Sequence, residues 1–149
     1  MKGTQMADRT SSSTTIKAGK AEIMAVIADL ESYPDWASGI REFTVQETGP
    51  DGRAARAKLT FDGGPFSDTV GLSYHWEGDD SVRWELVEKG NVVTALHGRY
   101  SLVEGDAETE VTYELAVDVR VPMIGMVKRK AEKRIIDSAL KGLKRHVER

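Results

Sequence analysis

Three histidines and four tyrosines are the side chains best suited to acid–base or metal chemistry in this sequence. His75 and His97 fall on the polar side of segments in which apolar and polar residues alternate, and His146 lies near the end of the chain. A metal site needs at least three ligands that converge on one point. This spacing therefore predicts solvent-exposed histidines and no metal site.

Common catalytic signatures are absent. The sequence contains no G-x-S-x-G, no phosphate-binding lysine loop, no H-E-x-x-H and no cysteine, so thiol nucleophiles and disulfides are excluded. Asp68, Thr94 and Tyr113 are expected to face inward, and Arg56 and Arg99 outward. A general base must lie within reach of the group that it serves, and the sequence alone places no such pair. Enzymatic activity therefore stays open, binding is favoured, and no cofactor is expected.

The elements that would position these residues are mostly strands, because the chain after Gly39 alternates with a period of two. Turn signals at residues 49–52, 62–65, 77–80, 88–91 and 104–108 divide it into six strands, and residues 11–17 form a seventh. The apolar side carries Val70, Leu72, Tyr74, Trp76, Val82, Trp84, Leu86, Val92, Leu96, Tyr100, Leu102, Val111, Tyr113, Leu115, Val117 and Val119. The other side is mostly polar, so one sheet face should be covered and the other should face water.

Two helical regions are expected to provide the cover. Ile23, Val26, Ile27 and Leu30 follow the i, i+3, i+4, i+7 spacing of an amphipathic helix, which should end or bend before Pro34. A second short turn should follow at residues 36–39. A longer helix should begin after residues 121–122, where Pro122 suits a first turn.

The C-terminal helix has two unequal faces. Ile124, Val127, Ala131, Ile135, Ser138, Ala139 and Gly142 share one stripe, which Ile136, Leu140, Leu143 and Val147 extend on one side. This apolar sector is wider than a surface helix needs, and it predicts a helix embedded in the concavity of a curved sheet. Gly142 costs a helix about 1 kcal/mol relative to alanine, so either a close approach or space for a ligand should offset it.

The same helix is strongly basic. The last 29 residues hold nine Lys or Arg against three Asp or Glu, whereas the other residues hold twelve against twenty-one. Solvation together with the helix dipole is the favoured explanation. Contact with an anionic membrane through Lys130, Lys133, Arg134 and Lys141 is the second. We expect no nucleic-acid partner, because the basic arc has no interleaved aromatic residues and the whole chain is acidic.

One domain is expected, at residues 11–149, with residues 1–10 disordered. No apolar run approaches the ~20 residues of a membrane span, and residues 1–15 have no apolar signal core. These features predict a cytoplasmic protein. The sequence leaves monomer and homodimer open.

The stretch IMAVIADLESYPDWASGIREFTV contains Val26, Asp29, Tyr33, Pro34 and Trp36 in a V-x-D and Y-P-x-W pattern. It resembles the opening of polyketide cyclase/dehydrase-like (SRPBCC) proteins of the START/Bet v 1 superfamily. Residues 121–145 likewise resemble the C-terminal helix of small actinobacterial members. Gly19 departs from the proline that members usually carry there.

The resemblance implies an α+β helix-grip fold: a curved antiparallel sheet of about seven strands wrapped around a long C-terminal helix, with two short helices between strands 1 and 2. It also implies a cavity between sheet and helix that holds a hydrophobic small molecule, such as a lipid, isoprenoid or polyketide-like compound. The expected lining is Phe61, Leu72, Tyr74, Trp84, Thr94, Leu96, Tyr113, Leu115, Val127, Ala131 and Ile135. Tyr33 and Trp36 are expected to plug the end of the core, to flank the pocket mouth, or both.

Three alternatives stay open beside this expectation. The aromatic residues of the inward side, which also include Phe66 and Tyr100, could simply fill a solid core. An aromatase/cyclase would use the same fold but would need polar groups that converge inside it. A docking module would act instead through the basic face of the helix.

Overall fold

The computed structural model describes residues 9–62, 67–120 and 125–149. Its elements in chain order are β1 (Thr10–Ile16), α2 (Lys20–Ala28), the 3-10 helix η1 (Leu30–Asp35), β2 (Ile40–Thr48), β3 (Ala54–Asp62), β4 (Ser67–Glu77), β5 (Ser81–Glu88), β6 (Val93–Glu104), β7 (Thr109–Val119) and α3 (Gly125–Glu148). Phe66, Pro122 and Ile124, on which some sequence expectations rest, lie outside the described residues.

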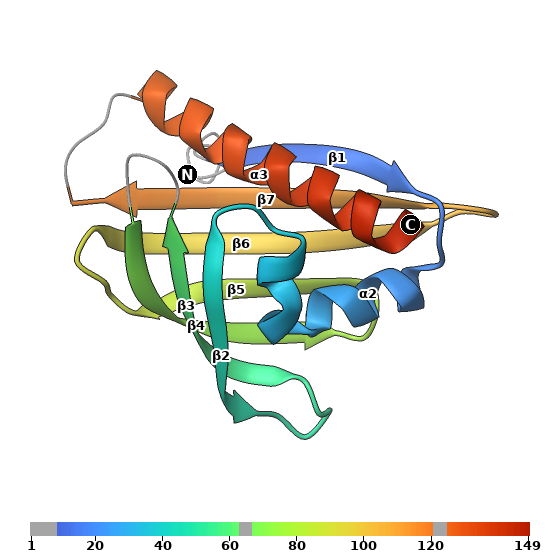
Figure 1. The fold of residues 1–149 in the computed structure, drawn as a ribbon, viewed down its shortest axis with the longest axis horizontal. Coiled ribbons are helices and arrows are strands. Elements are labelled where there is room, and N and C mark those ends of the chain that lie inside the picture. The colour runs from blue at the N-terminus through green and yellow to red at the C-terminus, as the bar shows by residue number, and fades with distance from the viewer. Residues whose placement is uncertain (1–8, 63–66, 121–124) are drawn as a thin grey trace, which may run out of the picture.

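The seven strands form one antiparallel sheet in the order β1-β7-β6-β5-β4-β3-β2. Strands β2 to β7 follow each other as a meander, and β1 closes the far edge by pairing with β7. α2 and η1 lie between β1 and β2, and α3 crosses one face of the sheet (Figure 1). The predicted α+β helix-grip fold is confirmed, with two short helices between β1 and β2. Their bounds differ from the expected ones, because α2 already ends at Ala28 and the second helix is η1 at Leu30–Asp35, before the turn expected at residues 36–39.

The long helix lies over the β1–β7 side of the sheet (Figure 1). Glu132 fixes it there, since one carboxylate oxygen accepts a hydrogen bond from the Thr10 hydroxyl and the other accepts one from the Val117 backbone N–H. Lys144 adds a bond to the Thr15 carbonyl. Some of the basic residues of α3 therefore serve to attach it to the sheet. Within the part of the chain that the structure describes, no helix is long and apolar enough to cross a membrane.

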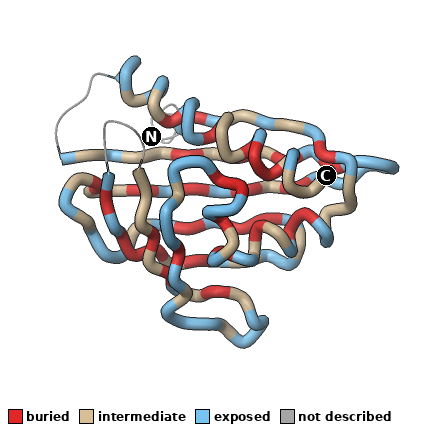
Figure 2. The backbone as a smooth tube through the Cα atoms, in the orientation of Figure 1, coloured by how far each residue is buried: buried red, intermediate tan, exposed pale blue. Residues whose placement is uncertain are grey.

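The face of α3 that packs on the sheet differs from the expected one. Its buried stripe is Glu132, Ile136, Leu140 and Leu143, whereas Val127 and Ile135 are 46% and 38% exposed. Figure 2 shows the same contrast, with exposed segments in the first turns of α3 and buried ones towards its end. The stripe that was expected to face the sheet, which includes Val127 and Ile135, therefore lies to one side of the buried stripe. A sequence pattern gives the angles between residues, but it does not give the angle at which a wide apolar sector docks.

Gly142 lies where α3 meets η1 and the residue after it. A Cβ atom here would lie 1.9 Å from the Trp36 carbonyl oxygen, a distance that no side chain tolerates. Close approach therefore explains this glycine. Its contact is with the backbone at Trp36, the residue that follows η1.

Strand β6 contains one irregularity. Val93 pairs with Val119, but Ala95 pairs with Asp118, so a bulge falls at Thr94. The bulge reverses the alternation before it. Val93 is consequently buried, and Val92, which the alternation had placed inward, is half-buried.

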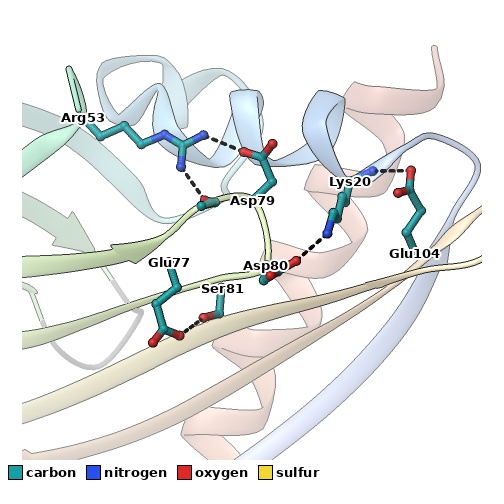
Figure 3. Close-up of polar contacts among 8 residues, drawn as sticks. Lys20, Arg53, Glu77, Asp79, Asp80, Ser81 and Glu104 are labelled. Atoms are coloured by element: carbon teal, nitrogen blue, oxygen red, sulfur yellow. Dashed lines mark hydrogen bonds and ion pairs between the residues drawn. The ribbon is translucent and has the colours of Figure 1, made fainter.

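Polar contacts attach the start of α2 to the β4–β5 turn (Figure 3). The Lys20 ammonium pairs with Asp80, while the Lys20 backbone N–H donates to Glu104 at the end of β6. From the other side, Arg53 donates to the Gly78 carbonyl and to Asp79. The start of α2 is therefore held at both the β4–β5 turn and the end of β6, and Arg53, just before β3, is bonded to the same β4–β5 turn.

Candidate functional site

A continuous series of aromatic rings runs through the interior from η1 to β7. Tyr33 contacts Trp36 and Phe43, with centroids 4.6 and 5.1 Å apart. Phe43 leads to Tyr74 at 6.5 Å, and Tyr74 stacks on Trp84 at 5.7 Å. The series ends in a compact group in which Trp84, Tyr100 and Tyr113 all touch, with the two tyrosine rings 4.6 Å apart.

The strand register explains how Trp84, Tyr100 and Tyr113 meet. Tyr100 is directly opposite Tyr113 across β6 and β7, and Trp84 is opposite Gly98. A Cβ atom on Gly98 would fall 2.2 Å from the Trp84 indole. Glycine therefore leaves room for the indole to lie flat over β6, where it reaches both tyrosines.

The tyrosine hydroxyls differ in their partners. Tyr33 donates to the Ile27 carbonyl and is thereby fixed in the fold. Among the described residues, the hydroxyls of Tyr74, Tyr100 and Tyr113 form no hydrogen bond, although their side chains are buried. Trp36 Nε1 is the fully enclosed polar side-chain atom without a partner in this part of the chain. The three hydroxyls are not enclosed in that way, so they border space that water or a ligand can occupy.

Burial sets the protonation state of this interior. It raises the pKa of Tyr33, Tyr74 and Tyr100 well above 10, helped by the neighbouring tyrosines, and it raises the pKa of Tyr113 as well. A phenol with a raised pKa stays neutral at pH 7 and acts as a hydrogen-bond donor or acceptor, not as a base. The arrangement can orient an oxygen-bearing ligand without ionising.

Asp68 faces inward as expected, but it is occupied. Its carboxylate accepts hydrogen bonds from the backbone N–H groups of Thr69, Asn91, Val92 and Val93 at 2.8–2.9 Å. Burial opposes ionisation, but the four donors outweigh it and hold the pKa below its usual range. Asp68 therefore anchors the β5–β6 loop.

Glu132 is a buried carboxylate that the sequence reasoning missed. It sits between basic neighbours on α3, and no periodicity distinguishes it from a surface residue. In the fold it is 1% exposed and its two oxygens are bonded to Thr10 and Val117. The buried carboxylates of the described interior are thus both committed to structure.

The expected lining residues divide into two groups. Those on the sheet are buried on the concave face and lie together: Leu72, Tyr74, Trp84, Leu96, Tyr113 and Leu115. Phe61 and Thr94 are half-buried near strand ends. On α3, Val127 and Ile135 are exposed and Ala131 is half-buried, on the side of the helix that continues to Gly142.

Two further residues belong to the interior site. Phe43 on β2 links Tyr33 to Tyr74, and Tyr100 completes the tyrosine pair. Tyr100 was identifiable from its inward parity, whereas Phe43 lies in a mostly exposed strand that gave little signal. Tyr33 and Trp36, expected to plug the end of the core or to flank the mouth, are both buried against this series.

The remaining candidates lie outside. His75 and His97 are exposed, and His146 is half-buried. The described residues contain no group of three or more His, Asp or Glu placed to hold a metal ion. Among the described residues, a hollow of about 190 Å³ opens on the surface over β5, β6 and β7, and another of about 580 Å³ opens near Phe61, Asp68 and the β5–β6 loop.

Comparisons with known proteins agree with this architecture. The family profile described as "Polyketide cyclase / dehydrase and lipid transport" matches residues 7–148. No curated protein matches the sequence. A START superfamily protein from Mycobacterium smegmatis is similar in structure, with a TM-score of 0.87, 23% identity, and coverage of 94% of this chain and 97% of that one.

Two other solved structures are also similar. The ZhuI aromatase/cyclase from Streptomyces sp. R1128 has a TM-score of 0.77 at 14% identity, covering 95% of this chain and 93% of its own. A protein from Thermus thermophilus has a TM-score of 0.76 at 17% identity, covering 93% of this chain and 96% of its own. At these identities the likeness shows the fold alone.

Proposed function

Because this chain belongs to the polyketide cyclase/dehydrase and lipid transport family, we propose that it binds a hydrophobic small molecule between the concave face of its sheet and α3. The observation that carries the proposal is the set of three unbonded tyrosine hydroxyls among buried aromatic rings. A core that served only stability would give such hydroxyls a partner or replace them by phenylalanine. Tyr33, whose hydroxyl is bonded, is the internal comparison.

The binding mechanism has two parts. Burial of apolar ligand surface against the rings contributes about 25 cal/mol per Å². The hydroxyls of Tyr74, Tyr100 and Tyr113 then orient oxygen atoms of the ligand, as a few polar groups do in most small-molecule sites. The ligand is therefore an apolar molecule with carbonyl or hydroxyl groups, within the lipid, isoprenoid or polyketide range.

The direct test compares two single-atom changes. Nile red, a neutral aromatic probe with a carbonyl, is titrated into the wild type and into Tyr113→Phe and Tyr33→Phe. Loss of the unbonded Tyr113 hydroxyl should leave stability nearly unchanged and lower the affinity for the probe about tenfold. One lost hydrogen bond accounts for a change of this size. Loss of the bonded Tyr33 hydroxyl should lower stability by about 1 kcal/mol and leave affinity closer to that of the wild type.

A second pair of variants tests the route by which a ligand would reach the interior. Ala131→Trp places a large ring on the side of α3 that leads to Gly142, whereas Lys130→Trp places it on the outer face. Ala131→Trp should reduce probe binding and Lys130→Trp should not, with the fold of both checked by circular dichroism. Full probe binding in both Ala131→Trp and Tyr113→Phe would refute the interior site.

Aromatase/cyclase activity on this fold has weaker support. Its requirement is an inward acid or base with a partner that orients it. Asp68 and Glu132 are used by the backbone and by β1 and β7, and the interior tyrosines stay neutral. Incubation with a reactive poly-β-ketone would test it, and accelerated cyclisation lost in Tyr113→Phe would favour it over simple binding.

Contact with an anionic membrane is a second candidate, and one observation favours it. Met126, Val127 and Ile135 are exposed in the first turns of α3. Lys130 and Arg134 are exposed between them. A basic arc beside apolar residues is typical of helices that lie at a lipid surface. Lys133 contributes less, since it already contacts Ser12 and Asp137. Sedimentation with phosphatidylserine vesicles, compared between wild type and Lys130→Glu/Arg134→Glu, would decide it.

A further inference from the structure

The convex face of the sheet carries a small depression that the interior site does not use. It has a volume of about 190 Å³, and its polar lining is Arg9, Arg83, Glu85, His97, Arg99 and Glu114. These side chains alternate along their strands with buried residues such as Val82, Trp84 and Tyr113. They therefore point away from the aromatic interior, on the opposite side of the sheet.

Two arginines face each other at this depression. Arg83 on β5 is the direct register partner of Arg99 on β6. Like charges placed directly opposite on neighbouring strands repel each other. Arg99 forms a loose ion pair with Glu77 at 3.9 Å and a bond to Ser101, and its register partner on β7 is Glu114. Arg83 forms no ion pair or hydrogen bond to any described residue.

The depression exists because a small outward residue, Ala116, lies among longer ones. Its floor also includes the backbone at Gly98. His97 and Ala116 are register partners, and each lies two residues along its strand from the next register pair on this face, Arg99 and Glu114. Successive side chains on one face of a strand are about 7 Å apart. Arg9 closes the β1 side and is loosely held by Glu114 at 3.4 Å. The opening is thus bordered by guanidinium groups on two sides.

We propose that this depression is a binding site for a small oxyanion, of the phosphate or carboxylate class. Guanidinium groups present paired N–H donors that match the oxygens of both anions. A bound oxyanion would supply the acceptor that Arg83 lacks and would relieve its repulsion with Arg99. Glu85 and Glu114 also border the site, so it should favour a compact anion held at the arginine side. The site goes beyond the interior binding function and is independent of it.

Amide NMR gives a local readout. The ¹⁵N-labelled full chain is titrated with sodium phosphate, sodium acetate and sodium chloride at constant ionic strength and pH 7. Phosphate or acetate should move the Gly98 and Ala116 amide signals saturably, with a dissociation constant in the millimolar range or below. Saturation by one anion alone identifies the class. Shifts that are the same in chloride, or that do not saturate, overturn the proposal.

Two arginine variants on the same face complete the test. Arg83→Gln should weaken anion binding at least tenfold, and its melting temperature without anion should equal or exceed that of the wild type, because a like-charge contact is removed. Arg56→Gln, an exposed arginine on β3 opposite Ser73, should bind as the wild type does. Unchanged anion affinity in Arg83→Gln, or an equal loss in Arg56→Gln, would contradict the site.

Discussion

Replacing Gly142 by alanine tests how closely α3 approaches the chain after η1. A Cβ atom at this position would lie 1.9 Å from the Trp36 carbonyl oxygen, whereas ordinary contacts begin at 3.4 Å. The two segments must therefore separate by about 1.5 Å, the difference between those distances. The obstacle is a backbone atom, which cannot rotate away as a side chain would.

Two opposing effects decide the sign of the change. Alanine favours a helix over glycine by about 1 kcal/mol. Forcing extra volume into a packed contact costs about 1–3 kcal/mol, and the rigid neighbour places this site at or beyond the upper end. We expect a net loss of about 2 kcal/mol in the free energy of unfolding. For a chain of this length that lowers the melting temperature by about 4–8 °C.

Urea unfolding followed by circular dichroism measures the effect. Ser138→Ala is the matched control, because Ser138 lies one turn earlier on the same side of α3 and is also partly covered. It should be neutral or slightly stabilising. If Gly142→Ala gained about 1 kcal/mol, the value of helix propensity alone, the close approach of α3 to Trp36 would be refuted.

Three further predictions concern buried polar groups. Asp68→Asn should lower stability at pH 7 by about 2–3 kcal/mol, since an ionised acceptor of four backbone donors is lost. Because the folded pKa of Asp68 is lowered, the wild type should keep this stabilisation above pH ~4 and lose it as the pH falls further, through the folded pKa. The same dependence of stability on acidic pH in Asp68→Asn would contradict this. Glu132→Ala should cost about 2 kcal/mol in urea unfolding, as the Val117 N–H loses its acceptor, and a neutral result would exclude that role. Absorbance at 295 nm should show little tyrosinate near pH 10 in the folded protein, and stability should fall above that pH because the unfolded chain ionises first; normal titration of all tyrosines would show that they are not buried.

Much of the fold was predictable because its signals are local. The turns at residues 49–52, 77–80 and 104–108 and the alternation between them specified the strands. Pro34 was a poorer guide, because α2 already ends at Ala28 and Pro34 lies inside η1. Alternation also placed Tyr74, Trp84 and Tyr113 on the covered face. It failed at one point, before Thr94, where a bulge in β6 reverses the faces. A bulge is a property of the pair of strands and leaves no clear mark in either one.

The candidate site was only partly predictable for a related reason. The identity of the inward aromatic residues follows from parity, but their hydrogen bonding does not. The hydroxyls of Tyr33 and Tyr113 look alike in the sequence, and one is bonded to the Ile27 carbonyl while the other has no partner among the described residues. The inward parity of Asp68 suggests a possible acid–base group, but its four backbone donors commit the carboxylate to structure.

The basic C-terminal helix shows which properties follow from the sequence alone and which depend on the tertiary structure. The sequence by itself determined that the helix forms, that it is amphipathic and that its charge opposes that of the remaining chain, because these depend on residues a few positions apart. Only the fold decided which side packs inward. That choice rests on Glu132 reaching Thr10 across 122 residues of sequence, and on Gly142 meeting the backbone at Trp36. Contacts between such distant positions exist only once the sheet has placed them together.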